Sequence, residues 1–135
     1  MKKTAFILLS AALLSAAPYT KENRIQDMQT MAKAMGTIET GFFYNNQELI
    51  NQGASTLIDT IKKVEPPIEE VNEQNPLKKM MDRKIQMTNK IVKYINRKSR
   101  VLLERSQSND MHQATQAYTK IMQKCMECHY KIRKW

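Results

Sequence analysis

The residues best suited to chemistry lie together near the end of the chain, in KCMECHYKIRKW (residues 124–135). Both cysteines of the protein, Cys125 and Cys128, are found here, and His129 follows them directly. C-x-x-C-H is the spacing of covalent c-type haem attachment, in which two thiols bind the haem vinyl groups and the histidine ligates iron. On a helix, Cys128 and His129 lie about 60° and about 40° to either side of Cys125, so all three project from one face. The motif therefore predicts one covalently bound haem c, with iron held by His129.

Three other uses of this motif fit the sequence less well. A structural zinc site wants four ligands, and the other histidine, His112, lies about 25 Å along the same expected helix. A thioredoxin-like redox pair opens a helix beside a β-sheet, and the sequence shows no strand pattern. A disulfide between Cys125 and Cys128 would restrain almost nothing, because its stabilising effect depends on the length of the loop it closes.

A sixth iron ligand opposite His129 has to come from another helix. His112 is too far away along the same helix, so methionine is the remaining candidate, and the chain has ten. Met28, Met31 and Met35 cluster in the first helical segment. Methionines at helical spacing also serve as ordinary core packing, so the residue type alone leaves the ligand open.

The chain begins with the layout of a secretory signal peptide, expected over residues 1–17. Lys2 and Lys3 precede an uncharged, largely apolar run from Ala5 to Ala17. The run is shorter than the ~20 residues of a spanning helix, although an N-terminal anchor is the alternative. Removing it leaves 118 of the 135 residues, which suits one domain, residues 18–135. The sequence therefore predicts export to the periplasm with no membrane span in the mature chain.

The charge of the chain is positive. It falls from +9 to +7 without Lys2 and Lys3, and the cations are spread along the chain. This distribution is typical of a solvated helical surface, with docking onto an acidic protein as the second interpretation. No basic-aromatic motif indicates nucleic acid.

Apolar residues at helical spacing predict four helices and no strands. The marked segments are Ile25–Phe42, Leu49–Ile61, Leu77–Leu102 and Ala114–Cys128. Gly41 is the candidate break after the first segment, Asn45 or Asn46 the cap of the second, and Asn109 or Asp110 the cap of the fourth. Residues 66–76, bounded by prolines, form the one long connection. We expect an all-α, antiparallel four-helix bundle with haem attached to the C-terminal helix.

An export signal, a bundle of this size and C-x-x-C-H near the C-terminus together resemble the class II c-type cytochromes, the cytochrome c prime family. The resemblance implies a role near the haem for Arg133, four residues after His129, while Ile132 stands where relatives commonly have an aromatic residue. Low-spin relatives use a first-helix methionine, commonly in R-x-x-x-M, and Arg24 and Met28 fit that spacing. The glycine that often follows four residues later is Ala32 here, and Gly36 lies further along, so Met31 and Met35 stay in consideration.

The resemblance implies two functions. The first is a periplasmic electron carrier that exchanges electrons with redox partner proteins, with Met28 as the distal ligand. In the carrier, Arg133, or the nearby Lys131 and Lys134, would offset the charges of the haem propionates, although cations at a helix C-terminus are also favourable in themselves. The second is a high-spin protein that binds nitric oxide or carbon monoxide. The resemblance also implies a homodimer in which the first two helices of each chain pair with those of the other. Enzymatic activity is not expected, because no acid–base group accompanies the motif except Glu127, which is expected to face solvent.

Overall fold

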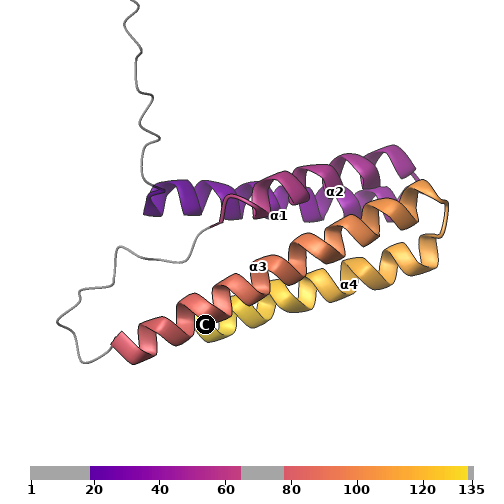
Figure 1. The fold of residues 1–135 in the computed structure, drawn as a ribbon. Coiled ribbons are helices and arrows are strands. Elements are labelled where there is room, and N and C mark those ends of the chain that lie inside the picture. The colour runs from indigo at the N-terminus through magenta and orange to yellow at the C-terminus, as the bar shows by residue number, and fades with distance from the viewer. Residues whose placement is uncertain (1–18, 65–77, 134–135) are drawn as a thin grey trace, which may run out of the picture.

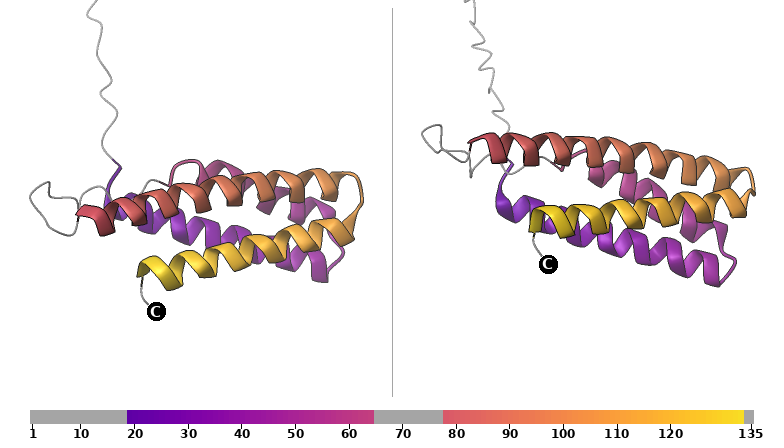
Figure 2. Two further views of the ribbon diagram at one scale, coloured as in Figure 1. Left: turned by 60° about the horizontal axis from the view of Figure 1, so that its bottom comes forward. Right: turned by 90° about the horizontal axis from the view of Figure 1, so that it is seen from below.

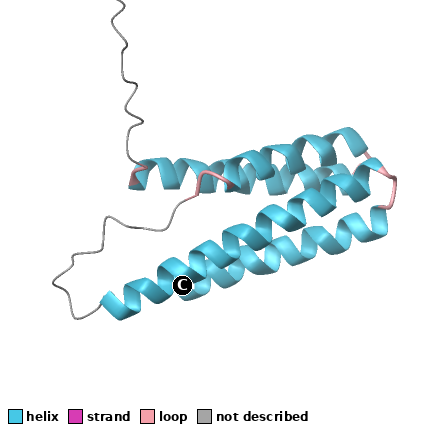
Figure 3. Ribbon diagram, viewed as in Figure 1, coloured by secondary structure: helices cyan, strands magenta, loops and turns pink. Residues whose placement is uncertain are grey.

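Four helices make up most of the chain. The computed structural model describes residues 19–64 and 78–133, with side chains for 19–64 and 82–131 (Figure 1). The helices are α1 (Lys21–Phe43), α2 (Gln47–Ile61), α3 (Lys78–Gln107) and α4 (Met111–Cys128), and α4 continues into a π-helical turn, η2 (His129–Arg133). The described residues contain no strand (Figure 3). The predicted all-α class is therefore confirmed.

Side-chain caps define the helix starts where the sequence predicted them. The Asn46 side chain accepts a hydrogen bond from the Leu49 amide at 3.1 Å, and Asp110 accepts one from Gln113 at 3.1 Å. Each bond satisfies an amide that has no partner within the helix. The expected break at Gly41 is wrong, because α1 continues to Phe43 and Gly41 is buried inside it. Its missing side chain matters for packing, since a Cβ there would lie 2.6 Å from Cγ1 of Ile50.

The helices form two antiparallel hairpins, α1–α2 and α3–α4, that pack into a bundle (Figures 1 and 2). Backbones approach within 8 Å along α1–α2, α3–α4 and α2–α3, whereas α1 and α4 hardly come that close. Figure 1 shows the hairpins drawing apart toward the end where α1 begins and α4 ends. The side of the bundle between α1 and α4 is thus its most open side, and the predicted motif lies there.

The core lies between the four helices and is made of aliphatic side chains. Several are removed from water almost completely, and each stabilises the fold by about 1.5–3 kcal/mol. The largest of these are Ile38, Ile50, Leu57, Ile61, Leu102 and Ile121. The buried hydroxyls of Thr60, Thr88 and Ser99 donate to a carbonyl one turn earlier on their own helix, as Ser99 does to Ile95 at 2.9 Å.

Two glycines offer a matched test of packing. A Cβ at Gly53 would lie 2.7 Å from the Ala34 carbonyl oxygen and 2.7 Å from Cγ1 of Ile38, whereas one at Gly36 meets nothing within 4 Å. Gly53→Ala should therefore push α1 and α2 apart and lower the free energy of unfolding by about 1–3 kcal/mol. Gly36→Ala should raise it by about 0.4–1 kcal/mol, because alanine favours helix. Urea denaturation measures both, and equal effects would contradict the tight α1–α2 contact.

Some predictions concern residues outside the described part. The signal segment 1–17, the start of the domain at residue 18 and the connection at 66–76 fall there and stay predictions. Among the helices that the structure describes, none combines the length and apolar character that a membrane span requires.

Candidate functional site

The C-x-x-C-H residues lie at the junction between α4 and η2. Cys125 and Cys128 belong to the last turn of α4, and His129 begins η2. All three side chains are half-buried, and both cysteines pack against the core cluster. Ile121, one turn earlier on α4, is 0% exposed. The motif therefore continues the inner face of α4 to the open end of the bundle, with all three groups on that face as predicted.

The helix widens where the motif ends. The His129 amide donates to the carbonyls of both Cys125 and Met126, and the following turn is π-helical through Arg133. A π-helical turn is less stable than an α-helical one and is found often at functional sites. His129 itself keeps α-helical backbone angles, with φ at −61° and ψ at −44°, and its amide makes the ordinary α-helical bond to Cys125, so the wider turn follows the motif and leaves the spacing within it unchanged.

The Cys125 thiol does not have the lowered pKa of a redox cysteine. Neither Cys125 nor Cys128 takes part in a disulfide bond. The pKa of the Cys125 thiol is raised to about 11, mainly by burial and to a smaller extent by the neighbouring Cys128. Redox cysteines in C-x-x-C motifs have the opposite shift, because the reactive species is the thiolate. Cys125 is thus a protonated thiol next to an apolar core.

Helix α1 presents the three candidate methionines to the same core. Met31 is buried at 7% exposed, and Met28 and Met35 are half-buried and packed against the core cluster. Arg24, one turn before Met28, is also half-buried. The structure thus gathers Arg24 and all three methionines on the inner face of α1.

One ring contact fixes the register between α1 and α4. Phe42 and Tyr118 meet edge to face, with centroids 5.8 Å apart and planes at 74°. Met31 lies eleven residues before Phe42 on α1, and His129 lies eleven residues after Tyr118 on α4. Because the two helices are antiparallel, Met31 and His129 are at the same level along the bundle. Met28 then lies one turn, about 4.5 Å, further along the axis. Both methionines are therefore within about one turn of the level of the histidine.

The donor set at this end of the bundle suits an apolar, iron-containing macrocycle. Two thiols and an imidazole stand on α4, and thioethers stand on α1 across the open side. On α4, Ile121 is completely buried, whereas Cys125, Cys128 and His129 nearer the end of the helix are only half-buried. A flat apolar group placed here would cover surface that the helices themselves leave partly exposed. The residues present fit haem.

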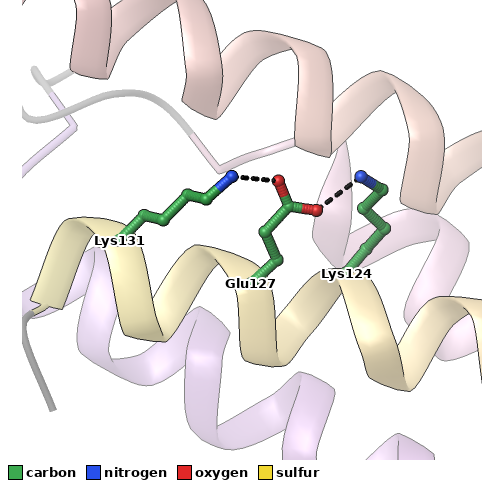
Figure 4. A network of polar contacts seen from close by, with 3 residues as sticks. All are labelled: Lys124, Glu127 and Lys131. Atoms are coloured by element: carbon green, nitrogen blue, oxygen red, sulfur yellow. Dashed lines mark hydrogen bonds and ion pairs between the residues drawn. The ribbon is translucent and has the colours of Figure 1, made fainter.

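Glu127, inside the motif, does not simply face solvent as expected. Its carboxylate accepts hydrogen bonds from Lys124 at 2.5 Å and from Lys131 at 2.8 Å (Figure 4), and its side chain is 30% exposed. Spacings of three and four residues place the partners on neighbouring turns of one helix face. Lys131 is thus paired with Glu127 in the structure, and its role at a haem propionate stays a prediction.

The Glu127 network predicts a pH effect on stability. Hydrogen bonds from Lys124, then Lys131, lower the pKa of Glu127 to about 2. A lowered carboxyl pKa stabilises the fold above the ordinary value of about 4.3, and this effect disappears as pH falls toward 2. Glu127→Gln should lower the free energy of unfolding at pH 7 by no more than about 1 kcal/mol, because the pair is partly solvated. Urea titrations at pH 7 and near pH 2 should show the difference only at pH 7; a difference that persists at pH 2 would contradict it.

The remaining predicted residues are less well defined. Arg133 belongs to η2, but its side chain and all of Lys134 lie outside the described residues. His112 is exposed at the start of α4, well away from the motif. Among the residues described, no three histidine, cysteine, aspartate or glutamate side chains gather as a metal-binding group.

The sequence interpretation missed a tertiary contact beside the motif. Lys124 lies over the Tyr94 ring of α3, 5.2 Å from its centroid. Arg97 and Lys98 approach the same ring at 5.4 and 5.9 Å. The i, i+3 spacing of Lys124 and Glu127 was visible in the sequence, but a contact between α3 and α4 depends on their register in space.

The chain was compared with protein-family models, with curated proteins and with solved structures, and none of them matches it.

Proposed function

We propose that this protein is an exported c-type haem protein that carries electrons, similar to the class II c-type cytochromes. Cys125 and Cys128 tether the haem and His129 ligates its iron. The observation that carries the proposal is the C-x-x-C-H motif on the half-buried inner face of the last helix, at the open end of a four-helix bundle. The raised pKa of the Cys125 thiol, caused mainly by burial, does not fit a redox cysteine, whose pKa is lowered.

The chain's own residues would attach and orient the group. Each thiol adds across one haem vinyl group, with sulfur bonding to one carbon and hydrogen to the other, so no atom is released. His129 supplies the proximal nitrogen. Arg24 on α1 and Arg133 on η2 are the cations proposed for the propionates. When bound, haem iron supplies one-electron chemistry, with a potential that the axial ligands set.

Met28 is the proposed distal ligand. Met31 is level with the histidine but is packed in the core at 7% exposed, so moving its sulfur to iron would leave a cavity. Met28 lies within one turn of that level and is only half-buried. Its side chain can turn toward α4 without emptying the core. A thioether opposite histidine raises the reduction potential, which suits an electron carrier.

Binding of nitric oxide or carbon monoxide is the second candidate. The open α1–α4 side favours it, because a half-buried Met28 is easier for a small gas to displace than a packed residue. If Met28 did not bind the iron, the resting protein would have a high-spin spectrum and the position opposite His129 would be free for a gas; if Met28 did bind it, the gas would have to displace it.

Optical spectroscopy of the purified, exported protein separates these functions. An alkaline pyridine haemochrome spectrum tests for haem c. A low-spin ferric spectrum with the weak long-wavelength band of methionine-ligated iron is expected for the carrier. A high-spin spectrum that shifts when carbon monoxide is added to the ferrous protein would support gas binding in place of electron transfer. The absence of any haemochrome would overturn both.

A further inference from the structure

A line of cations runs along the exposed face of α3. Its members are Lys90, Lys93, Arg97 and Arg100, and all four are exposed. Their spacings of three and four residues place them on successive turns of one helix face, over about 15 Å. We call these four residues the basic stripe.

Among the described residues, no carboxylate neutralises the stripe. Asp82 and Glu104 are the closest acidic residues along α3, and residues 83–103 contain none. In the described part of the chain, the ion pairs involve other residues, and no stripe side chain pairs with a carboxylate. Like charges one turn apart repel and weaken a helix. A bound anionic surface would relieve this repulsion.

A shallow hollow lies along the stripe. It has a volume of about 320 Å³ and is lined by Lys90, Lys93, Tyr94 and Arg97. Three cations and an aromatic ring therefore surround a space with no acidic residue. This lining suits the carboxylates of acidic side chains, since a carboxylate can accept several charge-assisted hydrogen bonds at once.

The stripe begins beside the haem-attachment motif. Lys124 of α4 lies 5.2 Å from the Tyr94 ring centroid and also binds Glu127 within the motif (Figure 4). Since α3 and α4 are antiparallel, four residues back from Tyr94 and four residues on from Lys124 cover about 6 Å each. Lys90 is therefore at the level of Cys128.

We propose that the basic stripe is the docking surface for an acidic patch on a partner protein. Charge complementarity steers such a partner and orients it at the contact. Docking would bring the partner to the side of the bundle next to the motif. Electron exchange at that place rests on the proposed function, whereas binding of the acidic partner does not depend on it.

A membrane is the less suitable occupant. Peripheral membrane binding combines cations with apolar side chains that enter the lipid. Among the described residues, no exposed large apolar side chain lies on α3 with the stripe, since Tyr130, 73% exposed, is on η2, and Phe43 and Tyr44, 82% and 76% exposed, are at the α1–α2 turn. That turn is at the opposite end of the bundle from the motif (Figure 1).

The test compares two variants of equal net charge. In the stripe variant, Lys90, Lys93, Arg97 and Arg100 are replaced by glutamate. In the control variant, the exposed lysines Lys21, Lys33, Lys63 and Lys120 are replaced by glutamate. A third variant has glutamine at the four stripe positions, which removes the positive charges without reversing them. Circular dichroism verifies that each variant is folded.

Binding to poly-L-glutamate, an acidic polypeptide, is measured by titration at low and physiological salt. The stripe variant should bind at least about tenfold more weakly than wild type, and the control less than about threefold more weakly. Equal losses in the two variants would show a net-charge effect and overturn the proposal. Tighter binding to vesicles of phosphatidylglycerol, lost in the stripe variant, would overturn it in favour of a membrane surface.

Electron exchange provides the second readout. Ferrous protein is oxidised with hexacyanoferrate(III), an anion, or with tris(phenanthroline)cobalt(III), a cation. The rate with the anion should fall severalfold in the stripe variant and little in the control, and the rate with the cation should rise. Unchanged rates with both oxidants would show that the stripe does not act on electron transfer at the haem edge, and would overturn its role in electron exchange. A protein without haem would overturn the proposed function, and poly-L-glutamate binding would still decide the docking surface.

Discussion

Replacement of both Cys125 and Cys128 by alanine should abolish covalent haem attachment while the bundle still folds. Both side chains are half-buried at the end of the core, so their loss empties little packed volume. The thioethers, by contrast, have no substitute, because these are the only cysteines in the chain. Haem should then be absent from the polypeptide band after denaturing electrophoresis, detected by its peroxidase stain, and extractable with acidified organic solvent.

Single replacements sharpen this prediction. Cys125→Ala or Cys128→Ala should leave one thioether and one vinyl group, which shifts the pyridine haemochrome band toward that of a haem with a free vinyl. Met126→Ala is the matched control, since Met126 lies between the cysteines and is 47% exposed. It should keep the full stain and an unchanged spectrum. If the double variant retains covalent haem, the assignment of the motif is wrong.

Local signals in the sequence predicted most of the fold because the physics behind them is local. The caps Asn46 and Asp110 were identified from residue type and position, and both satisfy helix amides. Gly41 was misread because a glycine near a helix end has two uses. It can end a helix, or it can let another helix approach closely, and only the position of Ile50 decides between them.

The site was predictable in part for the same reason. C-x-x-C-H is a contiguous pattern on one helix, and its three side chains share a face as helix geometry requires. The contact between Tyr94 and Lys124, and the level of the methionines relative to His129, depend on how separate helices slide against each other. Helical periodicity leaves that sliding undetermined, because a shift of one turn preserves the apolar face.

Substitution of Met28 by alanine should convert the ferric haem from low to high spin. The thioether of Met28 is the proposed sixth ligand, and alanine offers none. The midpoint potential should fall, because methionine opposite histidine stabilises ferrous iron. The ferrous variant should also bind carbon monoxide faster than wild type, because no ligand has to be displaced. Optical and paramagnetic resonance spectra, with a redox titration, measure these changes.

The other two methionines are the controls that make this result specific. Met35→Ala should stay low-spin, because Met35 is half-buried and lies about two turns beyond Met28 along α1. Met31→Ala should also stay low-spin but lose about 2–5 kcal/mol of stability, because Met31 is 7% exposed and part of the core cluster. A high-spin Met31→Ala protein beside a low-spin Met28→Ala protein would move the ligand one turn along α1. Low-spin spectra in all three variants would exclude a single methionine of α1 as the ligand.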